Sequence, residues 1–142
     1  MDFSGPELRI LVVDDNDVLR KLLAHALESA GYVVSTAESA EAALEVLRFH
    51  PPDLCVIDQV MPGMSGSELI RTLRRSADAR LRALPVLALT GLPAAEAEML
   101  AAGAQGAIQK PLREDLLLDG VRHALGGPGG PTPAPGVGLG LS

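Results

Sequence analysis

Short apolar runs alternate with longer amphipathic segments five times along the chain. The runs are three to five residues long and rich in Val, Ile, Leu and Ala, which is typical of strands buried on both faces of a parallel sheet. The predicted strands are Arg9–Val13, Tyr32–Thr36, Leu54–Ile57, Val86–Leu89 and Ala107–Gln109. Right-handed crossovers between parallel strands place helices on both faces of such a sheet. The pattern therefore predicts a doubly wound α/β fold.

The segments after the strands repeat apolar residues at helical spacing and predict five helices. Ser39 is a predicted N-cap of the second helix, and Ser65 or Gly66 begins the third. The fourth covers Ala94–Ala102 and the last Arg113–Leu125. The residues expected to face the core are Leu19, Leu22, Leu23, Ala26, Leu27, Ala40, Ala43, Leu44, Leu47, Leu69, Ile70, Leu73, Leu116, Leu117 and Val121.

The composition suits one globular domain, since 47% of the 142 residues are hydrophobic. A net charge of -6 and an aromatic content of 2% argue against direct binding of nucleic acid. Five arginines between Arg71 and Arg82 form a local cluster, which we interpret as a solvated surface, with docking of an acidic partner as the alternative. No apolar run reaches membrane-spanning length and residues 1–9 lack signal-peptide features, so we expect a cytoplasmic protein without membrane insertion.

The chain divides into three predicted parts. Residues 1–7 form an N-terminal extension, residues 8–125 the folded domain, and residues 126–142 a flexible Gly/Pro-rich tail or linker. The single cysteine, Cys55, lies in an apolar run and is expected to be a buried thiol.

Polar side chains follow the predicted strands at the points where they end. Asp14 and Asp15 follow the first strand, Asp58 the third, Thr90 the fourth and Lys110 the fifth. Ligands of doubly wound folds bind at the carboxyl ends of the strands, so we expect these five side chains at one rim. Carboxylates about 4 Å apart repel by roughly 4 kcal/mol at the dielectric of a protein surface. A hard cation with oxygen ligands relieves this repulsion, and the acids therefore predict a Mg²⁺ site.

The same set of residues suggests phosphoryl transfer to a carboxylate. Asp58 is the predicted nucleophile, which would form an acyl phosphate. Lys110 is expected to pair with the phosphoryl oxygens as a compact charge, and Thr90 to donate a hydrogen bond to them. A bound Mg²⁺ would neutralise the charge that develops during transfer.

The strand-end residues and two short motifs together resemble the receiver domain of response regulators. The matching residues, within a stretch from Leu8 to Leu125, are Asp14-Asp15, Asp58 with Met61-Pro62 and Gly66, Thr90, and Lys110-Pro111. The resemblance implies a flavodoxin-like fold with strand order 2-1-3-4-5. It also implies that Asp15, Asp58 and the backbone carbonyl of Val60 ligate Mg²⁺, that Asp14 acts mainly through bound water, and that a cis peptide precedes Pro111.

The resemblance implies that the chain is a signalling protein rather than an enzyme. The chain would promote only its own phosphorylation at Asp58 and the slow loss of that phosphate. The donor would be a phosphohistidine on a histidine kinase or a phosphotransfer protein. An unidentified downstream protein would bind around Ala94–Leu125, a surface that could also support phosphorylation-dependent dimerisation.

Two features depart from the receiver pattern. Ala107 occupies a position where an aromatic residue is usual, so a rotating ring cannot report phosphorylation here. Val60 and Leu92 lie two residues beyond Asp58 and Thr90 and, by resemblance, flank the path of attacking water. Either they exclude water and lengthen the life of the acyl phosphate, or they simply cap the core.

Three alternative functions stay open. A dinucleotide-binding domain expects a Gly-rich turn after the first strand, where this chain has four polar residues at 14–17. An aspartyl phosphatase typically has a second Asp two residues after the nucleophile, where this chain has Val60. A degenerate receiver would act as a phosphorylation-independent adaptor, which the intact acids and Lys110 argue against and Ala107 leaves open.

Overall fold

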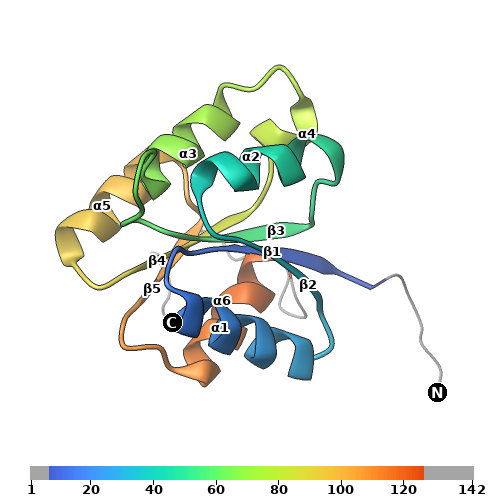
Figure 1. Ribbon diagram of the computed structural model, residues 1–142, viewed down its shortest axis with the longest axis vertical. Coiled ribbons are helices and arrows are strands. Elements are labelled where there is room, and N and C mark those ends of the chain that lie inside the picture. The colour runs from blue at the N-terminus through green and yellow to red at the C-terminus, as the bar shows by residue number, and fades with distance from the viewer. Residues whose placement is uncertain (1–6, 127–142) are drawn as a thin grey trace.

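The computed structural model describes residues 7–126, so most of the predicted N-terminal extension and of the Gly/Pro-rich tail lies outside the described residues. Five parallel strands form one sheet in the order β2-β1-β3-β4-β5 (Figure 1). The strands are β1 Arg9–Val13, β2 Val33–Ala37, β3 Leu54–Asp58, β4 Val86–Thr90 and β5 Gly106–Gln109. The predicted fold class and strand order are confirmed, with strand bounds that differ by at most one residue.

Within residues 7–126, six helices flank the sheet, where the sequence predicted five. They are α1 Asp17–Ser29, α2 Ala40–Phe49, α3 Gly66–Arg74, α4 Ala79–Arg82, α5 Pro93–Ala102 and α6 Glu114–Ala124. The additional helix, α4, is a single turn whose Asp78 side chain accepts a hydrogen bond from the Arg80 backbone N–H and whose Leu81 is buried. Four residues are too few to show a helical period, so the sequence pattern could not reveal it.

The sheet separates two hydrophobic clusters, one on each face. Leu11 and Val13 of β1 pack with α2, α3, α4 and α5, whereas Ile10 and Val12 pack with α1 and α6. Figure 1 shows α1 and α6 on one side of the sheet, with α2, α3 and α5 on the other. This division follows from strand geometry, since successive side chains point to opposite faces.

Two of the leucines predicted to face the core do not. Leu22 is 54% exposed and Leu116 is 43% exposed, whereas their neighbours Leu23 and Leu117 are fully buried. Consecutive helical residues point about 100° apart, so the one of two adjacent leucines that lies farther from the sheet can remain exposed. Cys55 is fully buried, as predicted. Within residues 7–126, no helix is long and apolar enough to span a membrane.

Serine side chains begin two helices as predicted. The Ser39 side chain accepts a hydrogen bond from the Ala42 backbone N–H at the start of α2. At the start of α3, the Ser65 hydroxyl accepts from the Glu68 N–H, and the Glu68 carboxylate accepts in return from the Ser65 N–H. This capping box satisfies donors that the first turn of a helix leaves unpaired, and it fixes where α3 begins.

Candidate functional site

Three carboxylates converge at the carboxyl ends of β1 and β3, and we call Asp14, Asp15 and Asp58 the acid cluster. The two strands are neighbours, with Val13 paired to Ile57, so the residues that follow them meet at one edge. One carboxylate oxygen of each acid lies within 4.8 Å of those of the other two. Asp14 and Asp58 are buried and Asp15 is exposed, which opens the cluster to solvent on one side.

Lys110 completes the site from the end of β5. Its Nζ lies 2.9 Å from Oδ1 of Asp58, and its side chain is 33% exposed. The Lys110 backbone N–H also donates to the carbonyl oxygen of Thr90 at 2.8 Å, which joins the ends of β4 and β5. The Lys110–Pro111 peptide is cis, as predicted. The Lys110 ammonium group thus contacts the predicted nucleophile directly.

The Thr90 side chain is buried beside this site, but its hydroxyl is engaged within its own loop. Thr90 Oγ1 accepts a hydrogen bond from the Leu92 N–H at 3.1 Å and donates to the Leu92 carbonyl oxygen at 3.3 Å. The predicted hydrogen bond from Thr90 to a phosphoryl group would therefore require the hydroxyl to exchange one partner for another.

Burial and crowding act together on the two inner carboxyl groups. Burial raises the pKa of Asp58, while the hydrogen bond and charge of Lys110 oppose the rise and the charge of Asp15 adds to it. Burial likewise raises the pKa of Asp14, against a hydrogen bond from the Asn16 backbone N–H, and the charges of Asp58 and Asp15 raise it further. The positive charge of Lys110 therefore offsets only part of the cost of burying these carboxylates close together.

One oxygen of the acid cluster is left without a partner. Asp14 Oδ2 is buried and has no hydrogen-bond partner among residues 7–126. A buried polar atom without a partner costs about 1–3 kcal/mol, so such atoms are rare unless a ligand satisfies them. A hard divalent cation bound by oxygen ligands would satisfy this atom and offset the repulsion between the acids. The residues present therefore fit a Mg²⁺ ion.

Val60 and Leu92 are exposed next to the site. Their exposed fractions are 69% and 62%, so the interpretation that they cap the core is wrong. The Val60 backbone N–H lies close enough to oppose, slightly, the rise in the pKa of Asp58. Metal ligation by the Val60 carbonyl and exclusion of water by the two side chains stay predictions.

Sequence reasoning missed several polar residues that support the site. The Asn16 side chain caps α1 by accepting from the Leu19 N–H, while its own N–H binds Asp14. Arg20 donates to the Asp14 carbonyl oxygen at 2.8 Å. The N-cap preference of Asn directly before an amphipathic helix could have identified the first. Nothing in the local pattern identified Arg20.

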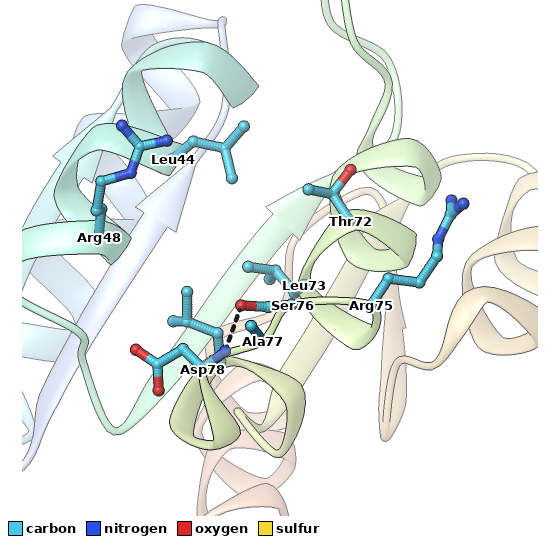
Figure 2. A pocket seen from close by; sticks show the side chains of 9 residues that line it. Leu44, Arg48, Thr72, Leu73, Arg75, Ser76, Ala77 and Asp78 are labelled. Atoms are coloured by element: carbon cyan, nitrogen blue, oxygen red, sulfur yellow. Dashed lines mark hydrogen bonds between the residues drawn. The ribbon is translucent and has the colours of Figure 1, made fainter.

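A separate hollow of about 660 Å³ lies between the C-terminal half of α2 and the segment joining α3 to α4 (Figure 2). The helices run antiparallel to the strands, so this hollow lies toward the opposite end of the sheet from the acid cluster. Its lining residues are Leu44, Arg48, Thr72, Leu73, Arg75, Ser76, Ala77, Asp78 and Leu81.

The predicted arginine cluster borders this hollow and is not a simple solvated surface. The half-buried Arg74 donates to the carbonyl oxygens of Gly103 and Arg82, and burial lowers the pKa of its guanidinium. Arg82 donates to the carbonyl oxygen of Ser76, and Arg80 forms an ion pair with Asp78. These arginines hold the connection between α3 and β4 in place.

The sheet topology defines a doubly wound, flavodoxin-like domain with an acid cluster at its strand ends, and comparison with known proteins identifies its family. Residues 10–122 match the family model of the response regulator receiver domain. The chain therefore belongs to the receiver domain family of two-component signalling.

Several curated relatives share this similarity. The chain is 38% identical over 133 residues to sensor histidine kinase AruS of Pseudomonas aeruginosa, covering 92% of this chain and 13% of that protein. It is 37% identical to response regulator MprA of Mycobacterium ulcerans, covering 83% of the chain and 50% of MprA. Two-component response regulator ARR17 of Arabidopsis thaliana is 34% identical, with 75% and 78% covered. The chain thus spans a small part of AruS and half of MprA.

Solved structures agree with this assignment. A response regulator from Chloroflexus aurantiacus superposes with a TM-score of 0.81 and 32% identity, covering 84% of this chain and 98% of that one. Chemotaxis response regulator CheY4 of Vibrio cholerae gives a TM-score of 0.77 and 30% identity, covering 84% and 99%.

Proposed function

We propose that Asp58 accepts a phosphoryl group from a phosphohistidine on a histidine kinase or phosphotransfer protein, with Mg²⁺ held by the acid cluster and the Val60 carbonyl. The observation that carries this proposal is the contact of 2.9 Å between Lys110 Nζ and Asp58 Oδ1 inside a group of three carboxylates. The three carboxylates would hold the metal, and the metal and Lys110 together would provide the positive charge that a phosphoryl group requires.

The transfer is a displacement at phosphorus. A carboxylate oxygen of Asp58 forms the new P–O bond while the P–N bond to the donor imidazole breaks, and the departing imidazole takes up a proton. Lys110, already bonded to Asp58, pairs with the phosphoryl oxygens as they arrive. Thr90 rotates its hydroxyl from Leu92 toward them. The acid cluster and the Val60 carbonyl would hold Mg²⁺, which would supply positive charge to offset the charge that develops on these oxygens.

Each acid has a separate task in this proposal. Asp58 would be the nucleophile, Asp15 would help to hold the metal, and Asp14 would act mainly through bound water. The unpartnered Asp14 Oδ2 supports this assignment, because a water on the metal would donate the hydrogen bond that it lacks. The Asn16 N–H fixes the other oxygen of Asp14 at 2.9 Å and so orients the group.

Altered partner binding would carry the signal onward. Receiver domains interact with histidine kinases and with downstream effectors, and here we propose the surface of α5, β5 and α6 as the effector face. It could also serve in phosphorylation-dependent dimerisation. The proposal retains a folded domain at residues 8–125, between an extension at 1–7 and a Gly/Pro-rich tail or linker at 126–142, and a cytoplasmic location.

The alternative is a degenerate receiver that binds partners without being phosphorylated. The retained acid cluster and its lysine contact favour the phosphorylated form. Ala107 is the feature that favours the adaptor, since it supplies no ring to report phosphorylation.

Phosphorylation by a small donor tests the proposal. The protein is incubated with Mg²⁺ and acetyl phosphate, and the intact mass is measured. We expect a single phosphoryl adduct that is absent from Asp58→Asn and from chelated samples, and present in Asp119→Asn, a control on the surface of α6. An unmodified wild type that also resists a cognate kinase would refute phosphorylation and favour the adaptor.

A further inference from the structure

A fully buried serine hydroxyl joins the loop after Asp58 to helix α5. Ser67 is the second residue of α3 and is 0% exposed. Its Oγ lies 2.9 Å from Glu98 Oε2 on α5 and 3.2 Å from Gln59 Nε2, and Gln59 directly follows Asp58 in the chain. The Ser67 backbone N–H donates to Gln59 Oε1 at 2.7 Å. The segment after β3, the start of α3 and the more distant α5 thus meet at one hydroxyl.

The directions of these hydrogen bonds follow from what each group can do. A carboxylate only accepts, so the Ser67 hydroxyl donates its single hydrogen to Glu98. Its two lone pairs then accept from the Gln59 amide and from the Ser65 hydroxyl, which lies 3.2 Å away. The donor and both acceptor sites of the Ser67 hydroxyl are thereby used. Gln59 donates to Ser67 and Ser67 donates to Glu98, so the two bonds form a chain from the segment after Asp58 to α5.

The start of α3 is also packed tightly against the backbone of Asp58. The Gly66 N–H donates to the Gln59 carbonyl oxygen at 3.0 Å. A Cβ added to Gly66 would overlap the Asp58 carbonyl oxygen and lie 2.9 Å from Met99 Cε of α5. The packing leaves no free space between this backbone and the two helices α3 and α5, which lie side by side (Figure 1). A shift of the Asp58–Gln59 backbone is therefore passed on to both helices.

We propose that Ser67 and Glu98 are positioning residues that transmit the state of Asp58 to α5, an inference that rests on the proposed function. Phosphorylation changes the partners of the Asp58 carboxylate, including Lys110 Nζ at 2.9 Å, and so moves the Gln59–Val60 backbone that follows it. Gln59 moves Ser67, and Ser67 moves Glu98. Capping of α3 alone would need only Gln59 and Ser65, so the bond to Glu98 is the contact that a purely local role does not explain.

A second contact on the same helix provides a matched control. Glu96 Oε1 accepts a hydrogen bond from Gln109 Nε2 at 2.8 Å, and Gln109 precedes Lys110. Glu96 and Glu98 are carboxylates on one helix, but only Glu98 bonds to the segment after Asp58. Changing each in turn separates transmission through α3 from transmission through β5.

We call the path from Asp58 through Gln59, Ser67 and Glu98 to α5 the relay. Amide hydrogen exchange along α5 tests the relay in protein treated with Mg²⁺ and acetyl phosphate. The fraction of protein that carries the phosphoryl adduct is measured by intact mass in the same sample. In wild type we expect phosphorylation to change exchange in Pro93–Ala102 by at least about threefold. Ser67→Ala and Glu98→Ala should cut that change to less than half at equal occupancy. Glu98→Gln, which keeps an acceptor oxygen, should retain it, and Glu96→Ala, which removes the contact with Gln109, should leave it intact.

The outcomes separate the relay from the phosphorylation on which it rests. A fully phosphorylated wild type with unchanged exchange in α5 overturns the relay alone, as does a response that survives both Ser67→Ala and Glu98→Ala. A response lost in Glu96→Ala but kept in Glu98→Ala assigns transmission to β5 and also overturns it. If wild type forms no adduct, both the proposed function and the relay fall.

Discussion

Replacing Asp14 with Asn should stabilise the metal-free protein and remove most of its stabilisation by Mg²⁺. Asp14 is fully buried, carries an unpartnered oxygen, and lies within 4.8 Å of two further carboxylates. An amide of the same shape removes the repelling charge, and its NH₂ can donate to the acids that remain. The Asn16 N–H still finds an oxygen acceptor.

The magnitude follows from the spacing of the acids. Two unit charges about 4.8 Å apart repel by about 3.5 kcal/mol at an effective dielectric of about 20. Attraction between Asp14 and Lys110 offsets part of this repulsion, and solvent at the exposed Asp15 screens more. We therefore expect a net gain of about 1–2 kcal/mol, which corresponds to a rise in Tm of roughly 5 °C for a domain of this size. Mg²⁺ at about ten times its Kd should stabilise wild type by about 1.4 kcal/mol.

Thermal unfolding in EDTA and in Mg²⁺ measures both effects, with Asp119→Asn as a surface control. The control should unfold like wild type in each buffer and keep the Mg²⁺ shift. A lower Tm for Asp14→Asn in EDTA would refute the repulsion argument. An undiminished Mg²⁺ shift in that variant would show that Asp14 takes no part in holding the ion.

Three further predictions concern the same site. Burial raises the pKa of Asp14 and of Asp58, so as the pH falls from neutral the folded state binds these protons before the unfolded state does. Metal-free wild type should therefore gain stability relative to Asp14→Asn. Urea unfolding in EDTA should show a smaller difference in the free energy of unfolding between the two proteins at pH 5 than at pH 7. The exposed Val60→Asn substitution should shorten the half-life of the acyl phosphate severalfold without a change in Tm, as followed by intact mass after removal of the donor; an unchanged half-life would refute water exclusion. Gly66→Ala should destabilise the fold by about 3 kcal/mol or more in urea unfolding, because the new Cβ would overlap the Asp58 carbonyl oxygen. Gly91→Ala should cost little, because its Cβ would meet its nearest neighbour at 3.9 Å. Equal destabilisation by the two substitutions would contradict the packing argument.

The residue pattern alone determined the strands and the edge at which the chemistry lies. Buried parallel strands require continuous apolar runs, and the chain interrupts those runs with polar residues at a few points. Because the carboxyl ends of parallel strands meet at one edge, Asp14, Asp58 and Lys110 could be placed together without coordinates. The contact between Lys110 and Asp58 confirms that placement.

Only the tertiary structure decided which neighbours each side chain has. The helical period could not choose between Leu22 and Leu23, since the choice depends on how α1 lies against the sheet. The bond from Ser67 to Glu98 joins residues 31 positions apart, and no local signal specifies a contact of that separation. The unpartnered oxygen of Asp14 is likewise a property of the packed site. Local sequence fixes periodicity and strand ends, whereas hydrogen-bond partners depend on the packing of elements that are remote along the chain.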